Sequence, residues 1–154
     1  MVKSIIKIFI RRAGFWNSKD FKISSQFGHI FLYADNLFYS FTQKKFLPKG
    51  NRSNFQIIDK REFCKTYKNQ DWHVITLEVT TDEIMKISSY FNDSSNNIEY
   101  SLVNNCMRQC QLALEKAGFQ FPRYFVLPGS MLSFLKRKKD SLPILNIEKL
   151  KIQK

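Results

Sequence analysis

The chain has 154 residues, of which 44% are hydrophobic and 25% are charged, with only five glycines and four prolines. This composition is typical of one globular domain, and it excludes a disordered, collagen-like or disulfide-stapled chain. Lys and Arg outnumber Asp and Glu by 25 to 13, and the resulting net charge of +12 favours a polyanionic partner such as anionic lipid or a bacterial envelope polymer. We expect no nucleic-acid partner, because the sequence carries no nucleic-acid-binding motif.

The N-terminal segment predicts a buried strand rather than a signal peptide. Ile5–Ile10 is a short apolar run interrupted by Lys7. A signal peptide needs about 7–15 apolar residues in a row and a small-residue cleavage site, and neither is present. We therefore expect synthesis in the cytoplasm without a Sec-type signal, and export by a specialised secretion system to act in the envelope of a target cell.

The next part of the chain is β-rich. The runs 27–34 and 37–42 flank the turn-forming pair Asp35-Asn36 and predict a hairpin with a two-residue turn. The sequence then predicts a basic loop at 43–53 and a strand at 55–59. A basic connector that carries Cys64 follows at 60–68, and a further strand is predicted at 72–80.

The second half of the chain is mainly helical. Thr80-Thr-Asp-Glu83 is a capping box that predicts a helix over 81–92. A polar loop and an extended piece follow, and Asn105 then provides the N-cap of a helix over 106–117. A short helix over 131–138 is expected before a basic C-terminal tail from about residue 139. The fold class is therefore α+β: a single domain, 1–154, in which a small antiparallel sheet packs against helices.

Cys106 is the residue of the sequence that most specifically indicates a catalytic role. If Asn105 is the cap, the Cys106 thiol lies in the first turn of the helix, where unsatisfied N–H groups and the helix dipole favour a thiolate and lower its pKa. The alternative is that Cys106 only packs in the core, as free cysteines commonly do. Cys110 is expected to be a small core residue, and a Cys106–Cys110 disulfide is unfavourable within one helix.

A nucleophilic thiol requires a base, and His29 is the candidate because it lies inside an apolar strand. The alternative is a buried structural histidine, and His73 is expected near the surface. In the hairpin register, Thr42 faces His29 and Ser40 is its diagonal neighbour, so either hydroxyl could orient the imidazole. A turn that is longer by one residue would place Phe41 opposite instead. The spacing of the two histidines and three cysteines predicts no metal site, and we expect no cofactor.

Four segments of the sequence together resemble those of a known family: Gly28-His-Ile-Phe-Leu-Tyr, Tyr39-Ser-Phe, Tyr100-Ser-Leu-Val-Asn-Asn-Cys106 and Ala117-Gly. With these segments, the sequence resembles the circularly permuted papain-like hydrolases over about residues 23–135. This group includes NlpC-type cell-wall peptidases, relatives of lecithin:retinol acyltransferase, and antibacterial toxins delivered by type VI secretion.

The resemblance implies a permuted papain-like fold and a role for each matching residue. Cys106 corresponds to the nucleophile and His29 to the general base. The third polar residue of the family corresponds to Ser40 or Thr42, which departs from the His, Asn or Asp expected there. Backbone N–H groups at the start of the Cys106 helix would form part of an oxyanion hole.

We therefore expect a thiol hydrolase that forms an acyl-enzyme on a bacterial envelope component. The first candidate substrate is a peptide amide bond of peptidoglycan, and the protein would then be a secreted antibacterial toxin with a cognate immunity protein and a secretion carrier. The first alternative is a phospholipase or lipid acyltransferase on anionic membrane, suggested by the many Phe residues and the basic runs 43–53 and 136–139. The second alternative is a non-catalytic basic binding protein.

Overall fold

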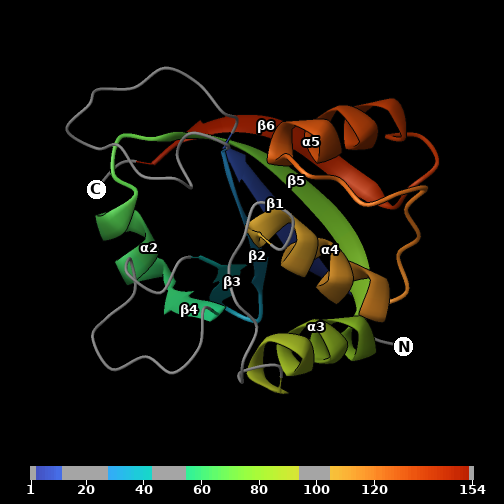
Figure 1. Cartoon of the computed structure of the whole chain (residues 1–154), viewed down its shortest axis with the longest axis horizontal. Helices are drawn as coiled ribbons and strands as arrows, with labels where there is room; N and C mark the ends of the chain where they lie inside the picture. Colours follow the sequence, from blue (N-terminus) through green and yellow to red (C-terminus); the bar gives the residue numbers. More distant parts are fainter. Residues whose placement is uncertain (1–2, 12–27, 43–54, 94–104, 153–154) are drawn as a thin grey trace.

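The structure is a computed structural model, and it describes residues 3–11, 28–42, 55–93 and 105–152. Within these residues the protein has an α+β fold, with a six-stranded antiparallel sheet in the order β4-β3-β2-β1-β5-β6 and four helices (Figure 1). The elements in chain order are β1 (Lys3–Arg11), β2 (His29–Ala34), β3 (Leu37–Phe41), β4 (Phe55–Asp59), α2 (Lys60–Thr66), β5 (Asp71–Thr80), α3 (Thr81–Asp93), α4 (Cys106–Lys116), α5 (Pro128–Arg137) and β6 (Ile144–Lys151). The α+β class and the antiparallel sheet packed against helices are confirmed.

The β2–β3 hairpin has the register that the sequence predicts. Asp35 and Asn36 both have positive φ, 52° and 65°, as a two-residue type I′ turn requires. Ala34 pairs with Leu37, and Leu32 pairs with Tyr39. The paired residues end at Leu32 and Tyr39, so the prediction that Thr42 faces His29 lies beyond the paired part of the hairpin.

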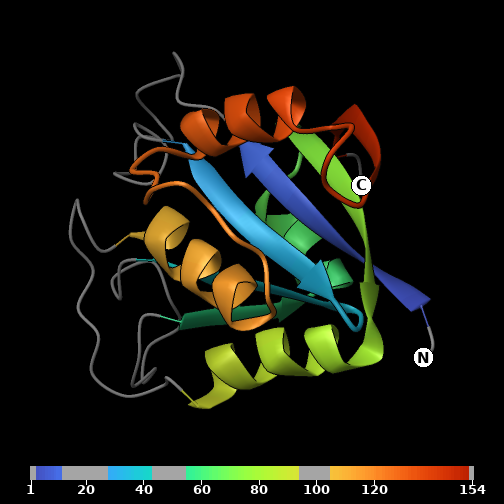
Figure 2. The same ribbon diagram turned by 90° about the vertical axis from the view of Figure 1, so that its right-hand side faces the viewer.

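Helices cover the two faces of the sheet unequally, as the two views show (Figures 1 and 2). Helices α3, α4 and α5 share one large core with alternate residues of the central strands. On the other face, α2 inserts Phe63 into a smaller aromatic cluster with Phe9, Phe31, Phe38 and Trp72. Since neighbouring strand residues point to opposite faces, β2 contributes Ile30 to the large core and Phe31 to the aromatic cluster.

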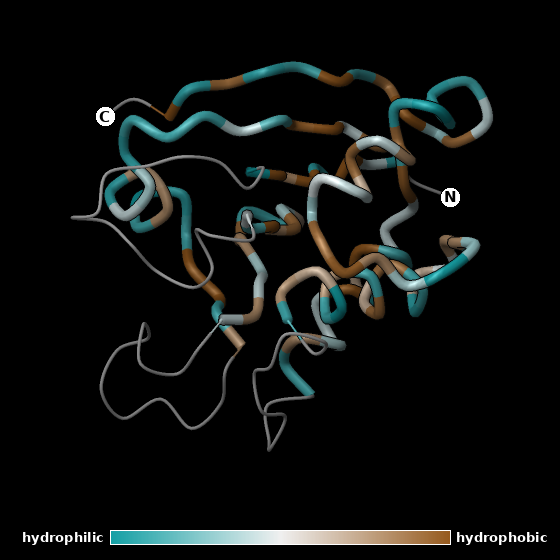
Figure 3. The backbone as a smooth tube through the Cα atoms, turned by 45° about the horizontal axis from the view of Figure 1, so that its top comes forward, coloured by the Kyte–Doolittle hydropathy of each residue, from teal (hydrophilic) through white to brown (hydrophobic). Residues whose placement is uncertain are grey.

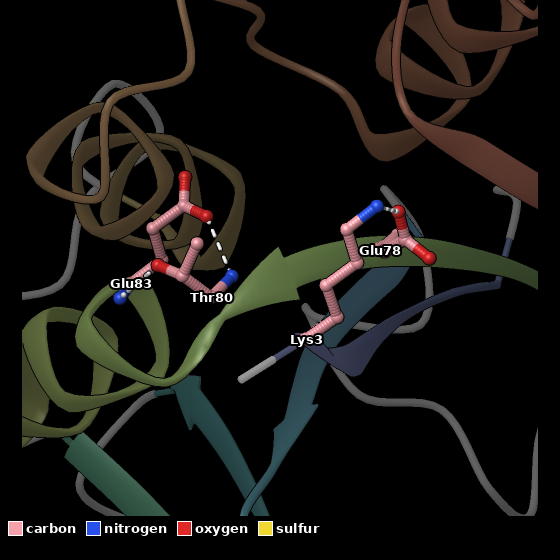
Figure 4. A network of polar contacts seen from close by, with 4 residues as sticks. All are labelled: Lys3, Glu78, Thr80 and Glu83. Atoms are coloured by element: carbon pink, nitrogen blue, oxygen red, sulfur yellow. Dashed lines mark hydrogen bonds and ion pairs between the residues drawn. The ribbon is translucent and has the colours of Figure 1, made fainter. Parts of the chain in front are cut away.

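The predicted capping box fixes the start of α3. The Thr80 hydroxyl accepts a hydrogen bond from the Glu83 N–H, and the Glu83 carboxylate accepts one from the Thr80 N–H (Figure 4). Nearby, Lys3 of β1 pairs with Glu78 of β5 at 3.2 Å. These contacts join the end of β5 to the first turn of α3 and to the first strand.

Two elements differ from the sequence predictions. The expected basic connector at 60–68 contains helix α2, whose N-cap Asp59 accepts a hydrogen bond from the Glu62 N–H. The expected basic tail contains strand β6, which pairs with β5 at the edge of the sheet. Figure 3 shows this edge strand, which leads to the C-terminus, with hydrophobic segments interrupting hydrophilic ones at irregular intervals. An edge strand that is exposed along most of its length lacks the apolar alternation by which strands are recognised.

Other boundaries differ by a few residues. Helix α5 begins at Pro128 rather than Met131, because proline is well suited to the first turn of a helix. The expected basic loop at 43–53 and the extended piece at 98–103 lie outside the described residues. In the part of the chain that is described, no helix is both long and apolar enough to cross a membrane.

Candidate functional site

Cys106 is the first residue of α4, as the sequence predicts. The Asn105 side chain caps the helix by accepting a hydrogen bond from the Arg108 N–H at 3.1 Å. The amide of the same side chain donates to the Val126 carbonyl at 2.9 Å. Asn105 therefore fixes both the helix start and the segment that passes beside it.

The thiol environment differs from the expectation of a lowered pKa. Cys106 is 3% exposed, and burial raises the pKa of its thiol to about 11. Hydrogen bonding to the backbone of Ile30 and Met107 and the charge of Arg11 act in the opposite direction, but they do not outweigh the burial. The resting thiol is therefore neutral at physiological pH.

His29 begins β2 and is 1% exposed. Its ring packs edge-on against Phe31, with ring centroids 4.8 Å apart, and lies over Tyr67 at 6.0 Å. The imidazole thus lies on the α2 face of the sheet, whereas Cys106 belongs to the core on the opposite face. Both residues lie near the same part of β2, because the backbone of Ile30, the neighbour of His29, is close enough to the Cys106 thiol to lower its pKa.

The Ser40 hydroxyl lies close to the imidazole of His29. Its Oγ lies 3.4 Å from His29 Nε2 and donates to the Ile30 carbonyl at 2.6 Å. Thr42 is also buried, at 4% exposed, just beyond the end of β3. Of the two hydroxyl residues predicted near His29, Ser40 therefore makes the described contact, although it is only the diagonal neighbour in register.

Cys110 is fully buried and packs in the core, as predicted, on the same stripe of α4 as Ala113 and Ala117. Its Sγ lies 3.8 Å from the Ile30 carbonyl, and burial raises its pKa well above the ordinary value. Cys64, Cys106 and Cys110 are all free, so the helix contains no disulfide.

Sequence reasoning missed two members of the site, Arg11 and Tyr67. Arg11 ends β1 directly opposite His29, and its guanidinium lies 5.9 Å from the Tyr67 ring centroid and 5.4 Å from that of Trp72. It also hydrogen-bonds to the Gln70 side chain. Burial lowers the pKa of Arg11 and raises that of Tyr67 to about 12.

The charge of Arg11 lowers the pKa of Cys106, and ionised Cys106 would raise the pKa of Tyr67, so both residues lie near the thiol as well as near the imidazole. For both Arg11 and Tyr67, the sequence contains one feature that could have indicated a place in the site. Arg11 is a charged residue at the end of an apolar strand, and Tyr67 follows the Asp59-Lys-Arg-Glu62 segment, which has the spacing of a helix start.

Among the described residues, no group of three or more His, Cys, Asp and Glu side chains is placed to hold a metal ion. The chain matches no protein-family model, no curated protein and no solved structure. The case for a function therefore depends on the geometry of the site alone.

Proposed function

We propose that this protein is a cysteine hydrolase in which Cys106 is the nucleophile and His29 the general base. The observation that carries the proposal is the position of the thiol: Cys106 is the first residue of α4, and the backbone of Ile30, next to His29, lies close enough to the thiol to lower its pKa. Ser40, which contacts His29 Nε2, would orient the imidazole, and the buried Thr42 is the second candidate for this role. A permuted papain-like arrangement, with the histidine strand before the cysteine helix, is part of this proposal.

In the proposed reaction the imidazole turns around the end of the sheet toward Cys106 and takes the thiol proton as Sγ attacks the substrate carbonyl carbon. The carbonyl oxygen becomes an oxyanion that is stabilised by backbone N–H groups at the start of α4. The imidazolium then protonates the leaving amine or alcohol, and a thioester remains on Cys106. Water, deprotonated by the imidazole, attacks the thioester, and collapse releases the acid and restores the thiol.

The buried and neutral resting thiol suits a general-base mechanism better than a stable thiolate. Because burial raises the pKa of Cys106 to about 11, the proton must leave in concert with the attack, and the nearby cation of Arg11 would stabilise the negative charge that develops on sulfur. The base is therefore essential to turnover under this proposal.

For the substrate, a peptide amide bond in peptidoglycan is the first candidate, because the net charge of +12 suits an anionic cell wall. In this setting the protein would act as an antibacterial toxin with a carrier for export and an immunity protein. An acyl ester of a membrane phospholipid is the second candidate. It is favoured by the exposed apolar side chains of Tyr124, Val126 and Leu127, in a segment that lies beside the start of α4.

The test offers the purified protein peptidoglycan and phospholipid vesicles in parallel and identifies the products by mass. We expect hydrolysis of one substrate by wild type and by Cys110→Ala, and none by Cys106→Ser. Cys110→Ala is the matched control because it removes a thiol one turn away in the same helix. Equal activity of the Cys106→Ser variant would overturn the proposal and favour a binding protein in which this cysteine only packs.

A further inference from the structure

The segment between α4 and α5 exposes apolar side chains to solvent. Tyr124, Val126 and Leu127 are 47%, 55% and 38% exposed, whereas Phe125 between them is buried. The other large apolar side chains that are exposed in the described part of the chain are spread over four different elements: Ile5 on β1, Ile57 on β4, Met85 on α3, and Leu145 and Leu150 on β6. Three exposed apolar residues within four positions therefore form a local patch.

Two buried side-chain amides hold this segment in place: Asn105, the N-cap of α4, and Gln111 within the helix. The Gln111 side chain donates to the Arg123 carbonyl at 2.7 Å and accepts from the Phe125 N–H at 3.0 Å. Asn105 donates to the Val126 carbonyl at 2.9 Å. Figure 2 shows the resulting path, in which the chain leaves the end of α4 and runs back along the helix before α5. The exposure of the apolar side chains is thus imposed by specific contacts of the backbone.

Cations accompany the apolar side chains. The Arg108 guanidinium lies 3.7 Å from the centroid of the Tyr124 ring, and Arg123 is exposed beside it. A tyrosine with an apolar ring and a polar hydroxyl is suited to the boundary between lipid and water. Arginine pairs well with phosphate, and each basic residue near an anionic bilayer adds to the attraction.

We propose that residues 123–127 dock the protein on an anionic phospholipid bilayer, with Val126 and Leu127 entering the interface and Arg108 and Arg123 contacting lipid phosphates. Glycan strands and stem peptides of peptidoglycan offer no hydrocarbon for these side chains, so the patch fits lipid better than cell wall. Docking would also bring the start of α4, and Cys106 with it, to the lipid surface. That last step rests on the proposed function, whereas the docking itself does not.

The test measures co-sedimentation of the full chain with vesicles made of equal parts of phosphatidylcholine and phosphatidylglycerol. The background is Cys106→Ser, so the vesicles are not hydrolysed and a failure of catalysis cannot be mistaken for a failure of docking. We expect the Val126→Asn/Leu127→Asn variant to bind at least about tenfold more weakly. Arg123→Gln should bind about fivefold more weakly, because one basic residue near the anionic surface is removed.

The matched control is Leu145→Asn/Leu150→Asn, because Leu145 on β6 is 56% exposed, about as much as Val126. This control should bind as tightly as the parent, and vesicles of phosphatidylcholine alone should bind all of the proteins more weakly. Equal losses in the two double variants would show that general surface hydrophobicity, and not this segment, binds lipid. Sedimentation with peptidoglycan but with neither type of vesicle would also overturn the proposal.

Discussion

At the residue scale, the burial of Cys106 has a consequence for stability that is independent of catalysis. Its thiol has an ordinary pKa of 9.0 and a pKa of about 11 in the folded protein. Below pH 9 the thiol is protonated in both the folded and the unfolded chain. Between pH 9 and 11 the unfolded chain releases a proton that the folded chain retains, so the free energy of unfolding falls as the pH rises.

A Cys106→Ser variant should therefore lose less stability than wild type across this pH range. The part of the loss that is due to Cys106 is about 3 kcal/mol, from about two units of pKa at 1.36 kcal/mol each. Denaturant unfolding at a series of pH values measures it, and Cys64→Ser, which changes a half-exposed thiol on α2, is the control. Parallel pH profiles for wild type and Cys106→Ser would contradict the assigned burial.

His29 and Cys106 should behave as one catalytic unit. His29→Gln keeps a side chain of similar size among the aromatic rings, and it should lower turnover at least about 100-fold, since it removes the general base. Combined with Cys106→Ser, it should add little to the loss of either single variant, because the two residues act in the same step. Turnover of the three variants on the substrate that the parallel peptidoglycan and vesicle assay selects measures this coupling, with thermal melts to confirm folding. Multiplicative losses would mean that His29 acts in packing and not in the reaction.

At the scale of the elements, the start of α4 combines a helix cap with support for the neighbouring segment. Asn105→Ala removes the acceptor for the Arg108 N–H and the donor to the Val126 carbonyl, so it should cost about 1–2 kcal/mol of stability. Asn105→Asp keeps the capping oxygen but has no amide donor. We expect the Asp variant to recover most of the stability while binding to anionic vesicles remains weakened. Denaturant unfolding and vesicle co-sedimentation measure the two effects, and an Asp variant as unstable as Ala would contradict the assigned cap.

The elements also show which local signals were sufficient for prediction from the sequence. The Asp35-Asn36 turn and the Thr80–Glu83 capping box are short and chemically specific, and the structure places both as predicted. Helix α2 was missed although Asp59 and Glu62 have the spacing of a helix start, because its seven residues are too few to show a clear helical period. Strand β6 was missed because it is defined by its pairing with β5 and not by an apolar pattern of its own.

At the scale of the whole molecule, the sequence could identify candidate residues but not the sides of the sheet to which they belong. Cys106 and His29 were predicted as catalytic partners, and the structure places them on opposite faces of the sheet, with the backbone of Ile30 close to the thiol. The pKa of the thiol could not be predicted either. The position of Cys106 at a helix start is visible in the sequence, but the depth of its burial depends on the packing of α4 against β2 and β3.

The place of Arg11 in the site could not be predicted from the sequence either. The residue lies near the site only because β1 pairs with β2 in a register that sets it opposite His29. Such long-range pairing has no local signal in the chain. The interpretation of the fold as α+β was secure from the elements alone, whereas the electrostatic surroundings of the candidate nucleophile required the assembled sheet.

The most direct test of the proposed function is to trap the acyl group on the enzyme. The protein is mixed with a short-chain p-nitrophenyl ester, quenched in acid and mapped by peptide mass. We expect acylation of the peptide that contains Cys106 in wild type and in Cys110→Ala, and its loss in Cys106→Ser. Acylation of other side chains alone, to the same extent in wild type and in Cys106→Ser, would contradict the role of Cys106 as the nucleophile.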